Sequence, residues 1–278
     1  MHEYLVADAF TSVPLEGNPV AVVLDASDLP APQMQRIARE MNLSETTFVL
    51  PPRDGGHARI RIFTPVNELP FAGHPMLGTA QVLGEKWQRD ELLLETEMGP
   101  IPVEMERTGD RITRIRMRQP IPTWESYDRA PELLAALGVT GSTLPVEAYR
   151  NGPRHVFVGL PGVEALAALR PDHRALTAFP DMAANCFAGE GRYWHTRMFS
   201  PAYGVVEDAA TGSASGPLAI HLARHGLVGH GTEIEIAQGV WLGRPSTMRA
   251  RAEHQDGRVT SVEMSGSAVT VARGTLLL

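Results

Sequence analysis

Short segments in which polar and apolar residues alternate dominate this chain. Arg59–Thr64 alternates charged and aliphatic side chains, as expected for a strand with one buried face. β-Branched and aliphatic residues predict further strands at Tyr4–Phe10, Val20–Leu24, Thr46–Leu50, Glu91–Glu97, Ile101–Glu106 and Ile112–Arg118. A helical period is clearest in Pro30–Met41, whose apolar residues fall on one face, and shorter helices are predicted at Pro131–Leu137 and near Val163–Leu169.

The two halves of the chain contain matching segments in the same order. Phe63–Pro75 and Phe199–Ala214 each contain an aromatic-polar-proline step and a glycine that opens a small-residue, apolar stretch. The two glycines, Gly73 and Gly212, are 139 positions apart (212 − 73), which is half of the 278 residues. Glycine and proline are common at the turns of any β-rich protein, so a single matching pair is weak evidence for a duplication. Two further pairs have separations of 134 and 140 positions and favour a duplication: Pro19 with Pro153, and Gly99 with Gly239.

The duplication predicts an α+β protein of two similar domains, each a barrel-like mixed sheet wrapped around a central helix. The expected domains are residues 1–126 and 127–278, joined through the aperiodic segment Pro120–Arg129, with a last strand able to cross to the other domain. If the halves face each other, two helix N-termini meet in one cleft. Free N–H groups at helix N-termini bind carboxylates and phosphates, so a small-anion site is expected between the domains.

Composition narrows the classes of partner. A formal charge of −7 leaves no basic excess for a nucleic-acid backbone. Cys186 is the only cysteine, which argues against a disulfide framework or a structural zinc site built on cysteines. Neither a signal peptide nor an apolar run of about 18 residues is found, so a cytoplasmic protein without a membrane span is expected.

Three ionisable residues lie at or near the matched loops. Taken singly, Glu45 is most simply a surface or capping residue, His74 a cap at a helix start, and Asp208 a turn residue. Taken by position, they place two carboxylates and an imidazole around one anion site. That combination indicates proton transfer beside a carboxylate, as in racemases, epimerases and isomerases.

Other chemistries fit less well. His221 and His225 have the spacing of zinc ligands on a helix, but no third ligand is evident, so no metal is predicted. Thr211–Gly216 lacks the lysine of a phosphate loop and the spacing of a hydrolase elbow, which disfavours a serine hydrolase that uses Ser213 or Ser215. No dinucleotide fingerprint follows a strand.

The chain resembles the PhzF-like family of phenazine-biosynthesis isomerases. The resemblance extends from the first strand to the C-terminus, and three long segments carry it: Met41–Phe48, Phe63–Pro75 and Glu207–Gly216. It implies a diaminopimelate-epimerase-like fold. It also implies isomerisation of trans-2,3-dihydro-3-hydroxyanthranilate, a small cyclic amino acid, to an aminoketone that condenses toward phenazines. No cofactor is implied, and a homodimer is expected.

The same resemblance implies roles for individual residues. Glu45 is expected to take a proton from C3 of the substrate and return it to C1. His74 and Asp208 are expected to steer the proton and hold the amine and hydroxyl groups. The substrate carboxylate is expected to bind Gly73, Gly212 and Ser213, at glycines where a side chain would block close approach.

Three alternatives remain besides the hydrolase. An epimerase of this fold that works with two opposed thiols is disfavoured by the single cysteine. The chain is alternatively a PhzF-like isomerase or epimerase of another small amino or ring acid. The third alternative is a non-catalytic binding protein of the same family, which the joint presence of Glu45, His74 and Asp208 disfavours.

Overall fold

The computed structural model describes all residues 1–278. The strands are β1 His2–Ala9, β2 Asn18–Val23, β3 Glu45–Leu50, β4 Ala58–Phe63, β5 Glu68–Leu69, β6 Glu91–Thr96, β7 Gly99–Thr108, β8 Arg111–Arg118, β9 Thr123–Ser126, β10 Glu147–Arg150, β11 Arg154–Gly159, β12 Ala183–Glu190, β13 Tyr193–Ser200, β14 Val205–Asp208, β15 Ile234–Gln238, β16 Ser246–Gln255, β17 Arg258–Gly266 and β18 Ala268–Leu276. The α-helices are α1 Ala31–Met41, α2 Gly73–Trp87, α3 Ala130–Leu137, α4 Val163–Ala167, α5 His173–Leu176 and α6 Gly212–Arg224, and two 3₁₀ turns are Pro201–Tyr203 and Val240–Leu242. No helix is long and apolar enough to cross a lipid bilayer.

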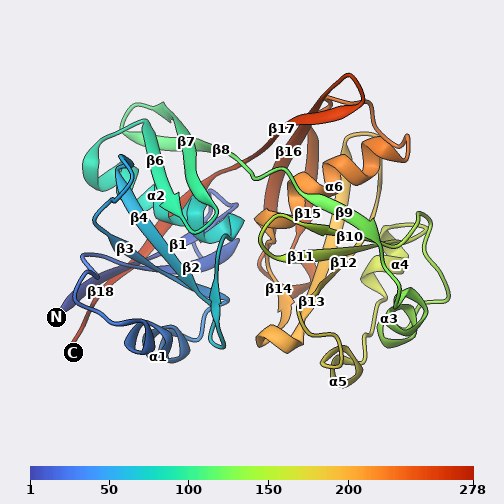
Figure 1. The fold of residues 1–278 in the computed structure, drawn as a ribbon, viewed down its shortest axis with the longest axis horizontal. Coiled ribbons are helices and arrows are strands. Elements are labelled where there is room, and N and C mark those ends of the chain that lie inside the picture. The colour runs from blue at the N-terminus through green and yellow to red at the C-terminus, as the bar shows by residue number, and fades with distance from the viewer.

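Two lobes lie side by side, and each wraps strands around one long helix (Figure 1). In the first lobe this helix is α2, in which every residue from Gly73 to Gly84 is buried. In the second lobe it is α6, buried from Gly212 to Ala223. A helix without a polar face must be enclosed by other elements. By contrast, α1 buries only one face, through Met34, Ile37 and Ala38, as its sequence pattern predicts.

The strand pairings repeat from one lobe to the other. In the first lobe β2 pairs parallel with β3, β3 antiparallel with β4, and β4 parallel with β6. In the second lobe β11, β12, β13 and β15 repeat this pattern of directions. The helices α2 and α6 occupy equivalent places in the two series. The same topology in both halves accounts for the matched sequence segments.

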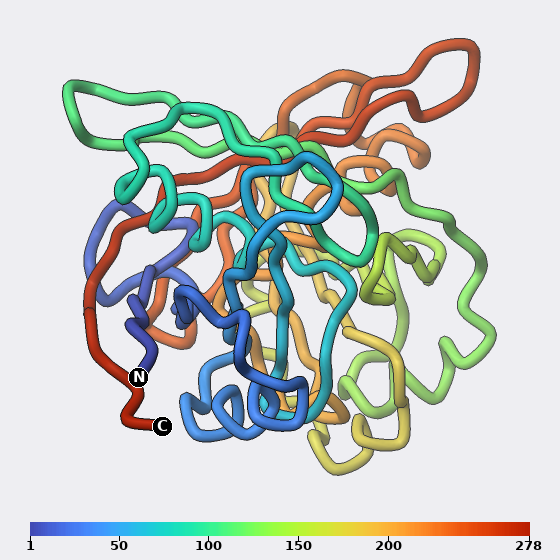
Figure 2. Tube along the Cα trace, turned by 60° about the vertical axis from the view of Figure 1, so that its left-hand side comes forward, coloured from blue at the N-terminus to red at the C-terminus, as the bar shows by residue number.

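Two strands are exchanged between the lobes. The last strand, β18, pairs antiparallel with β1, so the C-terminus lies beside the N-terminus (Figure 2). In the same way β9, which follows the first-lobe strand β8, pairs with β10 of the second lobe. The predicted linker segment Pro120–Arg129 therefore contains a strand, β9, which its aperiodic sequence did not indicate. β8 and β17 also pair with each other and join the lobes.

Candidate active site

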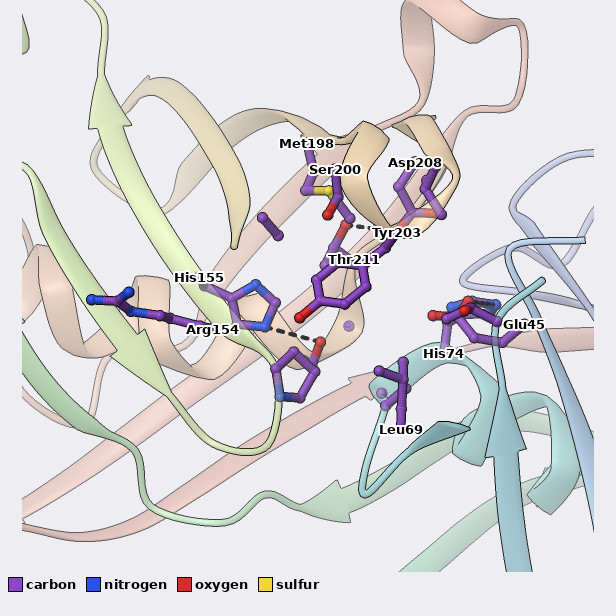
Figure 3. A pocket seen from close by; sticks show the side chains of 18 residues that line it. Glu45, Leu69, His74, Arg154, His155, Met198, Ser200, Tyr203, Asp208 and Thr211 are labelled. Atoms are coloured by element: carbon purple, nitrogen blue, oxygen red, sulfur yellow. Dashed lines mark hydrogen bonds and ion pairs between the residues drawn. The ribbon is translucent and has the colours of Figure 1, made fainter. Parts of the chain in front are cut away.

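All six residues predicted to form the site line one cavity between the lobes. The cavity is lined by residues of both lobes. Figure 3 shows Glu45 and His74 together on the side of the first lobe, and His155 on the side of the second. The structure brings together the predicted residues Glu45, Gly73, His74, Asp208, Gly212 and Ser213.

The N-termini of α2 and α6 touch at this cavity. A Cβ atom placed on Gly73 would lie 2.4 Å from the carbonyl carbon of Gly212 and from the nitrogen of Ser213. A Cβ atom on Gly212 would lie 2.7 Å from the Phe10 ring and 3.1 Å from the carbonyl carbon of Gly73. The sequence argument explained these glycines by the approach of a ligand. The structure shows another requirement, because only glycine lets the two helix starts approach each other so closely.

Glu45 and His74 form a buried pair on the side of the first lobe. Glu45 is the first residue of β3, and its Oε2 lies 3.4 Å from Nε2 of His74, with the side chains 13% and 3% exposed. Neither atom has a hydrogen-bond partner. Burial and the negative charge of Asp208 raise the pKa of Glu45 well above its ordinary value. Burial lowers the pKa of His74 to about 3, so its imidazole is neutral at pH 7.

Asp208 comes from the second lobe but is held by residues of the first. Its Oδ1 accepts hydrogen bonds from Asn18 Nδ2 at 2.7 Å and Ser44 Oγ at 3.2 Å, and its Oδ2 accepts from Thr211 Oγ1 at 2.8 Å. Burial raises the pKa of Asp208 to about 6, although these hydrogen bonds lower it. Two buried carboxyl groups that raise each other's affinity for protons can hold and release a proton near neutral pH.

The chain matches a family model described as "phenazine biosynthesis-like protein" over residues 7–274. The chain belongs to this family. The match confirms the family predicted from the sequence motifs around Glu45, His74 and Asp208.

Curated relatives agree with this assignment. Proteins from Pseudomonas fluorescens and Pseudomonas chlororaphis are 66% identical to the chain over 278 residues, and one from Pseudomonas aeruginosa is 64% identical, with all of both chains covered in each case. Each of these three relatives is named trans-2,3-dihydro-3-hydroxyanthranilate isomerase.

Solved structures share the architecture. A phenazine biosynthesis protein of the PhzF family from Bacillus anthracis has a TM-score of 0.87 at 26% identity, covering 100% of this chain and 99% of that chain. A hydroxyproline epimerase from Agrobacterium vitis has a TM-score of 0.67 at 13% identity, covering 98% of this chain and 91% of that chain, which shows the fold alone. Together with the lobes described above, they confirm the predicted α+β fold of the epimerase type.

Sequence reasoning missed two polar residues that hold the site of this family member together. Asn18, at the start of β2, donates from Nδ2 to Asp208 and to the Ala210 carbonyl at 2.9 Å. His155, on β11, is buried and contacts Ser213. Both residues lie beside the repeated proline turns at Pro19 and Pro153. The repetition was a usable signal, because matched turns of a duplicated fold lead into matched strands.

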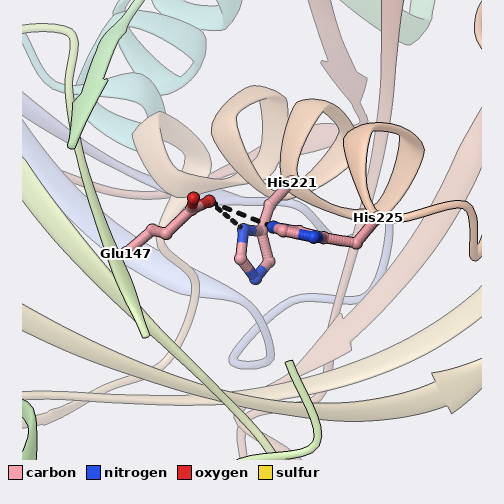
Figure 4. A group of neighbouring side chains, drawn as sticks. All are labelled: Glu147, His221 and His225. Atoms are coloured by element: carbon pink, nitrogen blue, oxygen red, sulfur yellow. Dashed lines mark hydrogen bonds and ion pairs between the residues drawn. The ribbon is translucent and has the colours of Figure 1, made fainter. Parts of the chain in front are cut away.

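Glu147, His221 and His225 form a second polar cluster, away from this cavity (Figure 4). Glu147 on β10 supplies the third ligand type that the sequence did not reveal, with Oε2 lying 3.1 Å from His221 Nδ1 and 3.2 Å from His225 Nε2. Arg224 Nη1 donates to the same oxygen at 2.7 Å. Since a guanidinium already neutralises this carboxylate, we interpret the cluster as a buried ion-pair network rather than a metal centre.

Proposed function

We propose that the chain isomerises trans-2,3-dihydro-3-hydroxyanthranilate by moving a proton from C3 to C1, with Glu45 as the single acid and base. The chain is an enzyme of the isomerase class, as its family and its full-length curated relatives indicate. The observation that carries the proposed mechanism is the Glu45 carboxyl group. It is nearly buried, faces the cavity and has an oxygen without a hydrogen-bond partner.

The environment of Glu45 allows its carboxyl group to take up a proton and then return it. The group begins ionised, becomes neutral when it removes the proton from C3, and is ionised again after it protonates C1. Burial makes the neutral form less costly, which is the physical meaning of its raised pKa. His74 is neutral and its Nε2 faces the Glu45 carboxyl group, so it can guide the proton without competing for it.

The helix starts suit the carboxylate of the substrate. Backbone N–H groups of the first helical turn are free for a ligand, and the helix dipole favours negative charge there. We place the carboxylate at Gly73, Gly212 and Ser213. This leaves Asp208 and His74 for the amine and hydroxyl groups of the ring. Movement of a proton by a carboxyl group requires no cofactor.

The structure argues against one alternative, thiol chemistry, and an experiment tests another, a different substrate. Cys186 lies in the core of the second lobe with no exposed surface, and burial raises the pKa of its thiol to about 12, which disfavours thiol chemistry. An isomerase of a different ring acid is distinguished by the substrates that it turns over. We expect the purified protein to consume trans-2,3-dihydro-3-hydroxyanthranilate and to yield a coloured tricyclic product. Turnover of other ring acids with no turnover of this one would overturn the proposed substrate, and tight binding without turnover would indicate a binding protein.

Assembly and location are proposed from the resemblance to the family. We propose a homodimer that works in the cytoplasm, with the chain divided into domains 1–126 and 127–278. Light scattering coupled to gel filtration tests the dimer, since a mass of one 30.2 kDa chain at working concentration would contradict it.

A further inference from the structure

The hydroxyl group of Ser213 has one hydrogen-bond partner, and it is not a carbonyl oxygen. Ser213 is the second residue of α6 and lines the cavity. Its Oγ lies 3.1 Å from Nε2 of His155, a buried residue of β11. A serine hydroxyl can donate one hydrogen bond and accept two. The direction of the bond to His155 therefore decides whether Ser213 keeps its hydrogen for a ligand.

Asn185 fixes that direction from the other side of the imidazole ring. Its Nδ2 lies 2.9 Å from the Ala183 carbonyl oxygen, which can only accept, so this atom of the amide is the nitrogen. The same Nδ2 lies 3.3 Å from Nδ1 of His155. Because an amide nitrogen only donates, Nδ1 of His155 accepts, and the proton of the neutral ring lies on Nε2.

The series of hydrogen bonds from Asn185 through His155 ends at Ser213, which lines the cavity. His155 donates from Nε2 to Ser213 Oγ, which uses the oxygen as an acceptor and leaves its own hydrogen free. Burial, together with the charge of Arg150, lowers the pKa of His155 to about 3, so the ring stays neutral under working conditions. We infer that Asn185 and His155 are positioning residues that keep the hydrogen of Ser213 free to donate, so that the start of α6 binds a carboxylate more tightly than the neutral amide of the same acid.

This inference rests on the proposed function, because it takes the carboxylate of the substrate to be the group at Ser213. A carboxylate presents only acceptors, and its two oxygens share the negative charge, whereas a carboxamide presents one acceptor and one donor group. The free hydrogen of Ser213 can therefore bond to either oxygen of the carboxylate but only to the carbonyl end of the amide. A hydrogen bond to a charged group is about twice as strong as one between neutral groups, so the discrimination favours the anion.

Matched substitutions of His155 test the inference. His155→Gln keeps a donor close to the position of Nε2, whereas His155→Asn keeps one only near Nδ1. The probes are 2-amino-3-hydroxybenzoate, an aromatic analogue of the substrate, and its carboxamide. We expect His155→Asn to raise the Kd of the carboxylate about 10-fold, on the scale of one charge-assisted hydrogen bond, and to change the Kd of the amide less than about threefold. For turnover, KM should rise while kcat stays nearly constant. His155→Gln should restore carboxylate binding.

Ser213→Ala separates a failure of this inference from a failure of the proposed function. If Ser213→Ala binds the carboxylate as tightly as the unmodified protein, the proposed carboxylate site is wrong. If Ser213→Ala weakens binding but His155→Asn does not, the positioning role of His155 is wrong. Should His155→Asn fail to fold, the ¹⁵N chemical shifts of His155 in the unmodified protein still decide. A proton on Nε2 supports the inference, and a proton on Nδ1 overturns it.

Discussion

The helix starts of the two lobes occupy equivalent places but carry different chemistry. In the first lobe, Gly73 is followed by His74, which faces the carboxyl group of Glu45 at 3.4 Å. In the second lobe, Gly212 is followed by Ser213, which contacts the neutral His155 at 3.1 Å. The first helix start therefore faces a carboxyl group with a raised pKa, and the second holds a chain of neutral hydrogen bonds. In the proposed mechanism, the proton-transfer group belongs to the first lobe, whereas the anion binds where the two helix starts meet.

Asp208 is the exception that links the two sides. It ends β14 of the second lobe, yet its hydrogen bonds from Asn18 and Ser44 come from the first. Its negative charge also raises the pKa of Glu45 across the interface. In the proposed mechanism, Glu45 therefore has its full electrostatic environment only when the second lobe is in place. The difference between the halves thus makes the contact between lobes part of the site.

Removing the base should produce the largest effect. We expect Glu45→Gln to lower turnover at least ~10²-fold, because a general acid or base contributes about that much or more. Binding of 2-amino-3-hydroxybenzoate should change little, since the anion site lies at the helix starts. The matched control is Glu40→Gln, at an exposed glutamate of α1, which should keep full activity. Turnover close to the unmodified rate in Glu45→Gln would show that Glu45 is not the base.

Crowding the contact between the helix starts should have the next largest effect. In Gly73→Ala the new methyl group would lie 2.4 Å from the backbone of Gly212 and Ser213, so the helices must move apart. We expect a loss of about 1–3 kcal/mol in the free energy of unfolding, typical of overpacking, together with weaker carboxylate binding. Gly141→Ala is the control, because nothing lies within 4 Å of a Cβ atom there. Urea unfolding and ligand titration measure the two effects, and unchanged values for both would refute the close contact.

The buried carboxyl group should also cost stability at high pH. The folded-state pKa of Glu45 lies above its ordinary value of 4.5. Its contribution to stability is therefore complete below about pH 4.5 and is lost as pH rises through the folded-state pKa. Glu45→Gln removes this loss, so the variant should gain more stability relative to the unmodified protein at pH 8 than at pH 5.

Urea unfolding of both proteins at the two pH values measures this gain. Buried histidines such as His74, whose pKa burial lowers to about 3, destabilise the fold as pH falls below their ordinary value of 6.5. They are present in both proteins and cancel, so the difference between the proteins reports Glu45 together with its coupling to Asp208. An identical difference at pH 5 and pH 8 would mean that Glu45 ionises as it does in water.

The sequence predicted the helix starts better than the contacts between strands. Small residues after Gly73 and Gly212 mark buried helices directly, and their separation reveals the duplication. The crossing of the last strand, β18, was expected, but that of β9 was not, because a strand's sequence does not say which lobe supplies its partner. Glu45 looked like a surface or capping residue when considered alone. It lies nearly buried beside His74 at the cavity between the lobes, a placement that no local pattern encodes.

The hydrogen-bonding residues around the site were hidden for a related reason. Asn18 looked like a turn residue, and His155 lies beside an ordinary apolar strand. Their partners, Asp208 and Ser213, are 190 and 58 positions away in the chain. His155 meets Ser213 because α6 packs against β11, and Asn18 meets Asp208 because the two lobes face each other at the site.

Isotope transfer tests the central claim, that one shielded carboxyl group moves the proton within the cavity. The measurement is a single turnover, in ordinary water, of substrate deuterated at C3. Because Glu45 is nearly buried beside His74, the deuteron it removes should exchange slowly with water and be returned in part. The account predicts product that carries deuterium at C1. Complete loss of deuterium to water in that single turnover would contradict it.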